Sequence, residues 1–328
     1  SMKIGVLGAG RIGQTHIINL AELPGVTEVL VYEPNASAAR CVQEVATVCS
    51  SAEEMFTRSD GVVVATPTSR HPEDVRAVAD AGLPCFSEKP ISLDLADTEA
   101  TIAYVAAAGT ELQVGFHRRF DPGFLKMRRA VESGDLGELY LIRAACHDYE
   151  PPHESYLPTA GSIFCDMHIH DFDAIAWLSG RTPIDVVARG SVLVDEMFAR
   201  YDDVDTSAAI MTLEGGALAM LTGTRQNGVG YDHRTEVIGS RDALSAGLGP
   251  QMPLRSADPG VLQPVDPYPS FPVRFHQAYA AEIAAFVDLV AGEGPNQCPG
   301  SAAEDALRVA LAADLSLARG STVRIDEI

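Results

Sequence analysis

A glycine pattern between a short apolar segment and an amphipathic one constrains the fold of this chain more than any other feature. Residues 3–8 are predicted to be a strand, and residues 11–22 carry an apolar face at helical spacing. Gly8, Gly10 and Gly13 lie at the turn between them and read GxGxxG. The first glycine allows the tight turn, the second lets a pyrophosphate approach, and the third lets helix and strand pack closely. The helix start adds N–H donors and partial positive charge. We therefore expect a dinucleotide site at Gly8, Gly10, Arg11, Ile12 and Gly13.

Glu33 ends the second predicted strand, which covers residues 26–32. A carboxylate at this place in a dinucleotide-binding unit accepts hydrogen bonds from both ribose hydroxyls and repels a 2′-phosphate. No arginine follows it, since the next residues are Pro34 and Asn35. The sequence thus favours NAD over NADP as the cofactor. The alternative, that Glu33 is only a solvated strand end, stays open at this point.

The pattern of predicted elements changes near residue 118. Before it, short apolar strands alternate with helical segments, which is typical of βαβ units and a parallel sheet covered on both faces. After it, several strands follow one another without helices, which indicates an antiparallel sheet. These strands are expected over residues 183–194, 207–213, 217–224 and 233–238. We therefore predict an α/β protein of two domains, residues 1–118 and 119–328.

Two segments carry candidate chemistry. Glu88-Lys89-Pro90 follows a predicted strand at residues 84–87, where open α/β sheets bind their ligands. A lone lysine is ordinarily a solvated surface charge, but this position favours a functional one. In the second segment, a helix expected from about Ser162 to Leu178 places Asp166 and His170 on one face, four residues apart. A carboxylate beside an imidazole orients it and favours its protonated form, as a general base requires.

A metal site is the alternative interpretation of the second segment, because Asp166, His168, His170 and Asp171 all offer ligand atoms. His168 lies two residues from His170, which is about 200° around a helix. The side chains therefore do not converge as in HExxH, and no metal is expected.

Taken together, these segments resemble the Gfo/Idh/MocA family of oxidoreductases, and within it the inositol 2-dehydrogenases. The resemblance covers nearly the whole chain. It rests on the glycine motif at 8–13, Ala65-Thr66-Pro67 with His71, Glu88-Lys89-Pro90, residues 115–122, Pro151-Pro152, residues 166–173, and Tyr231 through Gly239.

The resemblance implies a Rossmann domain followed by an α/β domain with a large, mainly antiparallel open sheet that often mediates oligomers. It implies that Lys89 bonds the reacting oxygen, that His170 takes its proton as a hydride passes to NAD, and that Asp166 orients the pair. The remaining implied residues are Thr66, Pro67, His71, Glu88 and Lys89 at the cofactor, and His117, Arg118, His147 and Tyr231 at the substrate beside the three catalytic residues.

Departures from the family pattern concern specificity. His117 stands where inositol dehydrogenases commonly have Met, Ala176 where they have Arg, and residues 146–150 also differ. An amino-substituted cyclitol is one hypothesis for these changes, and neutral drift is the other. Two further functions stay open, an NAD-dependent glycoside hydrolase and a non-catalytic NAD sensor.

Composition limits the partners. The chain has 24 Lys and Arg against 45 Asp and Glu, a net charge of −21, so phosphate backbones and anionic membranes are repelled. No apolar stretch approaches the roughly 20 residues of a bilayer span. Six cysteines form no CxxC pair, which favours a reducing cytoplasm. We expect a cytoplasmic enzyme of a small polyol or sugar, and the resemblance implies a homo-oligomer, dimer or tetramer.

Overall fold

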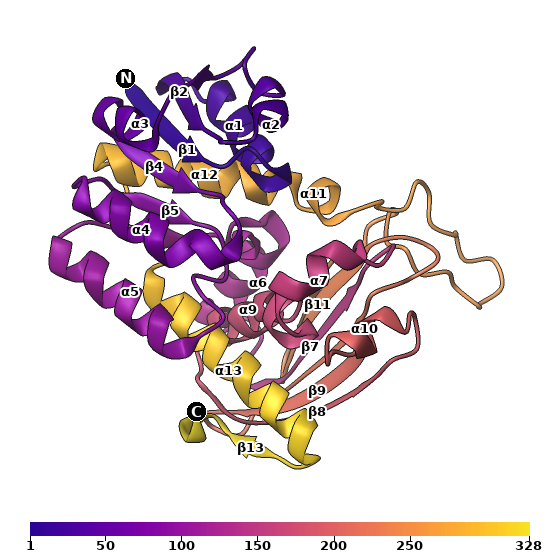
Figure 1. Cartoon of the computed structure of the whole chain (residues 1–328). Coiled ribbons are helices and arrows are strands. Elements are labelled where there is room, and N and C mark those ends of the chain that lie inside the picture. The colour runs from indigo at the N-terminus through magenta and orange to yellow at the C-terminus, as the bar shows by residue number, and fades with distance from the viewer. The chain divides into compact units, whose positions relative to one another are not determined.

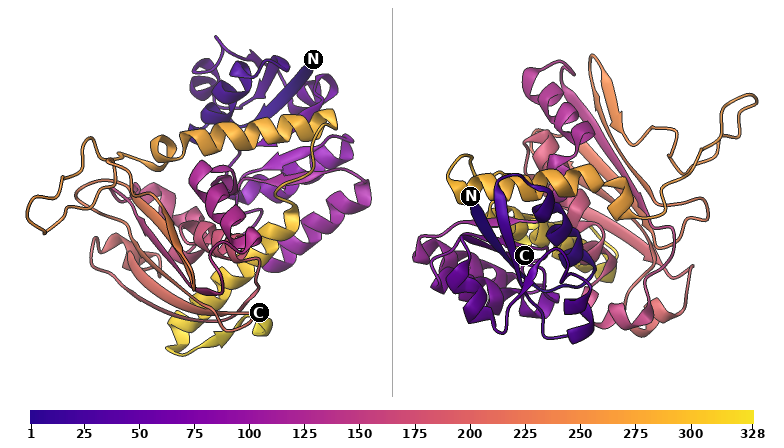
Figure 2. Two further views of the ribbon diagram at one scale, coloured as in Figure 1. Left: turned by 180° about the vertical axis from the view of Figure 1, so that it is seen from behind. Right: turned by 90° about the horizontal axis from the view of Figure 1, so that it is seen from above.

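The computed structural model describes all 328 residues, which form two compact units (Figures 1 and 2). The first comprises residues 1–120 and 277–304, and the second comprises residues 121–276 and 305–328. The sequence predicts one boundary near residue 118. In the structure, residues 277–304 also belong to the first unit, which the sequence did not predict.

The first unit is a Rossmann fold with six parallel strands in the order β3-β2-β1-β4-β5-β6. The order reverses between β1 and β4, and ligands bind at the carboxyl ends of strands at such a point. The strands are β1 Met2–Leu7, β2 Val26–Tyr32, β3 Thr47–Val48, β4 Gly61–Val64, β5 Cys85–Ser87 and β6 Leu112–Val114. The helices are α1 Arg11–Glu22, α2 Ala36–Arg40, α3 Ala52–Arg58, α4 His71–Asp80, α5 Leu95–Ala108 and α12 His276–Ala291, with 3-10 turns η1 Thr68–Arg70 and η2 His117–Phe120.

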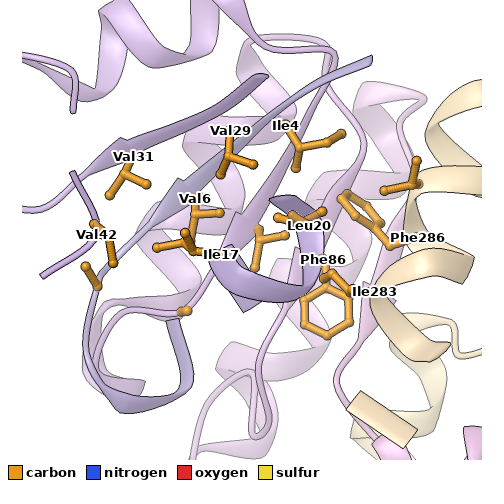
Figure 3. Close-up of a cluster of buried hydrophobic side chains, with 14 residues drawn as sticks. Ile4, Val6, Ile17, Leu20, Val29, Val31, Val42, Phe86, Ile283 and Phe286 are labelled. Carbon is orange, nitrogen blue, oxygen red and sulfur yellow. The ribbon is translucent and has the colours of Figure 1, made fainter. Parts of the chain in front are cut away.

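The core of this unit explains why α12 belongs to it. Ile4 of β1, Leu20 of α1 and Phe86 of β5 pack in one buried cluster with Ile283 and Phe286 of α12 (Figure 3). All five side chains have no exposed surface. Burying each apolar side chain of this size stabilises a fold by about 1.5–3 kcal/mol, so this contact fixes α12 on the sheet although it lies far along the chain.

The second unit is built on a mixed sheet of seven strands in the order β12-β11-β7-β10-β9-β8-β13. Only the pair β7 and β10 is parallel, so the sheet is mainly antiparallel as expected. The strands are β7 Leu139–His147, β8 Pro183–Ser191, β9 Thr206–Leu213, β10 Leu218–Thr224, β11 Asp232–Gly239, β12 Ala243–Ala246 and β13 Val323–Arg324. The helices are α6 Pro122–Ser133, α7 Leu157–Ala160, α8 Ile163–Asp166, α9 Ile169–Ser179, α10 Met197–Arg200, α11 Phe271–Arg274 and α13 Gly300–Arg319, with 3-10 turns η3 Glu154–Tyr156 and η4 Ile325–Glu327.

One face of this sheet is left open. Along β9 and β10, buried residues alternate with exposed ones, as on a sheet covered on one side. Ile210 and Met220 face each other across these strands and are 49% and 36% exposed. Leu218, two residues from Met220 on the same face, is 46% exposed. No helix in the structure is both long and apolar enough to cross a bilayer.

The helix expected from about Ser162 to Leu178 is interrupted, which corrects the prediction. It consists of α8 and α9, separated by a turn at Met167 and His168. His168 is fully buried, and its ring contacts Asp171 Oδ2 at 2.7 Å and Ser207 Oγ of β9 at 2.8 Å. Gly223 leaves room for this ring, because a Cβ there would lie 2.4 Å from His168 Nε2. Binding of His168 to the sheet accounts for the break.

Candidate functional site

The glycine turn after β1 has the geometry of a pyrophosphate-binding loop. Gly8 has a φ of +94°, and a Cβ there would lie 2.6 Å from the Ala65 carbonyl oxygen. A Cβ on Gly13 would lie 2.2 Å from the Gly8 oxygen, whereas a Cβ on Gly10 would enter open space. Gly10 is the N-cap of α1, and no side chain caps this helix. The loop therefore leaves room at Gly10 and helix N–H groups directed at that space, which fits a dinucleotide phosphate.

Glu33 is held next to this loop. Its Oε1 accepts a hydrogen bond from the Ala9 N–H and its Oε2 accepts one from the Asn35 N–H, both at 3.0 Å. Each carboxylate oxygen retains a second lone pair, and the residue is only partly buried. Glu33 can thus orient the loop and still accept hydrogen bonds from ribose hydroxyls.

The residues after β4 and β5 are joined by His71. This side chain is 2% exposed, and its Nδ1 lies 2.6 Å from the Pro90 oxygen and its Nε2 lies 2.8 Å from the Thr66 oxygen. Thr66 Oγ1 donates a hydrogen bond to Asp74 at 2.7 Å. The turn Thr66-Pro67 and the segment Glu88-Lys89-Pro90 are therefore brought together at one edge of the sheet. Lys89 itself is half-buried at this edge.

His16 is a site neighbour that sequence reasoning did not find. It lies on α1, and its Nε2 is 2.6 Å from Glu88 Oε1. Gly115 packs against the same carboxylate, since a Cβ there would lie 2.9 Å from Glu88 Oε2. A histidine on the apolar face of α1, three residues after Gly13, was the available signal. Such a residue is hard to distinguish from an ordinary core histidine without its partner.

His117 and Arg118 lie in the turn η2 after β6, and both are 3% exposed. The His117 ring stacks on Tyr279 of α12, with ring centroids 4.2 Å apart and an interplanar angle of 21°. Burial, with the nearby Glu88 and Glu282 carboxylates, raises the pKa of Tyr279 well above its ordinary value. Tyr279 therefore packs as a neutral phenol against His117.

In the second unit, Asp166 is held by two residues that sequence reasoning missed. The Tyr156 hydroxyl donates a hydrogen bond to Asp166 Oδ1 at 2.5 Å, and Arg225 donates one to Oδ2 at 3.0 Å. Arg225 is 4% exposed and also lies 3.4 Å from Asp148. Burial raises the pKa of Asp148 to about 6, although Arg225 opposes this shift. His170 is the second residue of α9 and Asp166 is the last of α8, so the pair spans the break between these helices.

The remaining two predicted substrate residues lie on different faces of the sheet. Tyr231 is 4% exposed, and its hydroxyl is 3.9 Å from Cys146 Sγ. His147, the next residue on β7, contacts Thr222 Oγ1 at 3.2 Å and Asp232 Oδ2 at 3.5 Å. Successive residues of a strand project to opposite faces, so His147 and Tyr231 are not brought together.

Comparison with known proteins gives matches over both units. The model of the oxidoreductase family with an NAD-binding Rossmann fold matches residues 2–116, and the model of the GFO/IDH/MocA C-terminal domain matches residues 124–245. A myo-inositol dehydrogenase, Hyg17, of Streptomyces leeuwenhoekii is 37% identical over 98% of both chains.

Solved structures agree with the sequence matches. A probable dehydrogenase from Thermotoga maritima has a TM-score of 0.92 and 33% identity over all of both chains. A scyllo-inositol dehydrogenase from Lactobacillus casei, solved with NAD(H) and scyllo-inositol, has a TM-score of 0.89 and 27% identity over 99% of both chains. On the fold, the nucleotide loop and these full-length matches, the chain belongs to the Gfo/Idh/MocA family of oxidoreductases.

Proposed function

We propose that this protein oxidises a secondary hydroxyl of a cyclitol or a related sugar with NAD. The observation that carries the proposal is the loop from Gly8 to Gly13 with Glu33 beside it, which fits NAD, in a chain whose relatives over its full length include inositol dehydrogenases. The inference from relatives to substrate concerns the class of compound, a cyclic polyol, and leaves the individual isomer to experiment.

NAD supplies the hydride acceptor when it is bound. The space at Gly10 and the start of α1 would hold its pyrophosphate, with Arg11 and Ile12 following in the helix, and Glu33 would accept hydrogen bonds from its ribose. Thr66, Pro67 and His71 would line the cofactor cleft with Glu88. His71 holds the backbone of this region through its contacts with Thr66 and Pro90.

We assign the chemistry of the reacting hydroxyl to three residues by resemblance to the family. The Lys89 ammonium donates a hydrogen bond to the substrate oxygen and stabilises negative charge there. His170 accepts the hydroxyl proton, and Asp166 orients the imidazole. The contacts of Tyr156 and Arg225 support this role for Asp166, because they fix both carboxylate oxygens. His117, Arg118 and Tyr231 are proposed to select the substrate, whereas His147, on the opposite sheet face from Tyr231, does not fit this role.

We further propose that the protein assembles as a dimer or tetramer through the open face of the second sheet. Ile210, Leu218 and Met220 expose apolar surface on this face, which favours burial against another copy. The six cysteines are free thiols, which suits a reducing compartment such as the cytoplasm. The net charge of −21 supports a small molecule as the partner of the protein, because this charge repels nucleic acids and anionic membranes.

The test is net NADH formation with a panel of myo-inositol, scyllo-inositol, glucose and an aminocyclitol, each with NAD and with NADP. We expect NADH with at least one cyclitol and a preference for NAD. Higher turnover of the aminocyclitol than of inositol would support the hypothesis that His117 and its neighbours adapt the site to an amino-substituted cyclitol. If NAD binds but no NADH accumulates with any compound, the proposed dehydrogenase activity is wrong, and glycoside cleavage becomes the next assay.

A further inference from the structure

Three buried polar side chains meet inside the first unit, and only Glu88 among them has been assigned a place, at the cofactor cleft. His16 of α1 and Glu282 of α12 have no exposed surface, and Glu88, which follows β5, is 9% exposed. One ligating atom from each side chain lies within 4.8 Å of those of the other two. The surroundings are aromatic, because the His16 ring makes edge contacts with Phe86 and Tyr279.

Glu282 is the member whose chemistry is most constrained. Neither carboxyl oxygen has a hydrogen-bond partner in the structure, although both are buried. Burial and the neighbouring Glu88 carboxylate raise the pKa of Glu282 well above its ordinary value. A second ionised carboxylate beside Glu88 would be costly in this environment. Burial beside Glu88 thus favours the neutral form of Glu282, whose hydroxyl can donate a hydrogen bond toward Glu88.

Other charged and polar groups lie near the cluster. Arg11 and Arg118 act on the neighbouring Tyr279, whose phenol is itself neutral. Gln113 of β6 is bonded to the backbone oxygen of Glu282 rather than to its carboxyl group. The Glu88 carboxylate is thus held by the 2.6 Å contact with His16 on one side and faces neutral Glu282 on another.

Stability alone does not explain such a cluster, because apolar residues of similar volume are commonly as stabilising as a buried ionic group. The position of the cluster offers an explanation, because Glu88 directly precedes Lys89 in the chain. We propose that His16, Glu88 and Glu282 form a positioning triad, in which the contact from His16 and the packing of Glu282 beside it orient the Glu88 carboxylate and thereby Lys89. The triad joins the helix that begins at the nucleotide loop to the strand that ends at the lysine. This inference rests on the proposed function, in which Lys89 donates a hydrogen bond to the substrate oxygen.

The lysines of this chain allow a test that does not depend on turnover. Lys3, Lys89 and Lys126 are its three lysines, so selectively labelled lysine gives three side-chain NMR signals. We expect His16→Phe, which keeps an aromatic ring but loses the contact with Glu88, to shift the Lys89 signal and leave the other two in place. His16→Gln retains a donor and is expected to restore the signal. Glu282→Ala should shift it, whereas Glu282→Gln, a neutral isostere, should not.

The same variants are then assayed for kcat, NAD affinity and thermal unfolding. His16→Phe should lower kcat roughly 10–100-fold, because a displacement of about 1 Å can cost that much, while NAD affinity changes less than about twofold. Ser59→Ala is the control, since it removes a buried hydrogen bond to Met55 in the same unit without touching Glu88.

Several results would overturn the triad. If His16→Phe lowers stability as Ser59→Ala does but leaves the Lys89 signal and kcat unchanged, the cluster is only structural. One bound metal equivalent that is lost in His16→Phe would make it a metal site instead. If Glu282→Gln shifts the Lys89 signal and lowers kcat while Glu282→Ala does neither, Glu282 does not act as a neutral acid. If the wild-type protein oxidises no cyclitol, the proposed function fails, but the NMR result still decides whether the triad positions Lys89.

Discussion

Glu33 follows β2 and holds the loop backbone, and we propose that it also selects the cofactor. We expect Glu33→Gln to lower the preference for NAD over NADP about 10–100-fold, since hydrogen bonds to charged groups contribute about 1.5–3 kcal/mol each. The measurement is the ratio of kcat/KM for the two cofactors. Glu28→Gln on the same strand is the control, because Glu28 pairs with Lys3 and Arg58 instead of the loop. An unchanged ratio in Glu33→Gln would assign cofactor choice to other residues.

We propose that Tyr156 supports the reaction by orienting Asp166. Tyr156→Phe removes the 2.5 Å hydrogen bond to Asp166 Oδ1 and little volume. We expect kcat to fall about tenfold with KM nearly unchanged, because Asp166 Oδ1 loses a donor and Arg225 alone orients the carboxylate less firmly. Tyr140→Phe, on an exposed tyrosine of β7, should have no effect. Equal kinetics for both variants would show that Asp166 needs no support from Tyr156.

At the scale of the element, the nucleotide loop offers a pair of substitutions with opposite consequences. Gly10→Ala should fold with normal stability, since its Cβ enters open space, but should weaken NAD binding about tenfold or more by occupying the phosphate site. Gly13→Ala should destabilise the fold, because its Cβ would lie 2.2 Å from the Gly8 oxygen. Calorimetric titration with NAD and thermal unfolding separate the two effects. Normal NAD affinity in Gly10→Ala would contradict the assigned loop geometry.

Elements that depend on local sequence were predictable, and those that depend on distant contacts were not. The strand, glycine turn and helix at residues 3–22 follow from hydrophobic period and backbone freedom within a short segment. The break before α9 depends on His168 reaching Ser207, 39 residues later, and the partner of His16 is 72 residues away. Likewise, the apolar face of α12 is visible in the sequence, but its packing on Phe86 is not.

For the whole molecule, buried acids make stability depend on pH. Burial raises the pKa of Asp314, like that of Asp148, to about 6. The folded state therefore holds protons that the unfolded state has released, so stability is greatest below the unfolded value near 4 and falls as pH rises through 6. The wild-type protein is expected to lose up to about 3 kcal/mol of its free energy of unfolding as pH rises through this range, and Asp314→Asn is expected to remove this loss.

Urea unfolding on both sides of pH 6 measures this effect. Asp258→Asn is the matched control, because Asp258 is an exposed loop residue. The assignment is wrong if Asp314→Asn and Asp258→Asn have the same pH dependence as the wild-type protein.

Assembly is also a property of the whole molecule. Ile210 and Met220 are register partners on the open sheet face, so lysines at both positions would place like charges opposite each other. By light scattering, we expect the wild-type protein to be an oligomer and the double variant Ile210→Lys, Met220→Lys to be a monomer. Leu262→Lys, at a loop residue that is 93% exposed, should leave the mass unchanged. A wild-type monomer would contradict the proposed assembly.

Lys89 is the residue on which the proposed NAD-dependent oxidation of a cyclitol depends most. The most direct measurement compares Lys89→Met with Lys126→Met, an exposed lysine in α6, in NADH formation and in NAD binding. We expect Lys89→Met to lose roughly 10²–10³-fold in kcat while NAD still binds, because one charge-stabilising donor is removed. Lys126→Met should behave as the wild-type protein. Undiminished oxidation by Lys89→Met would show that the reaction does not need the Lys89 ammonium.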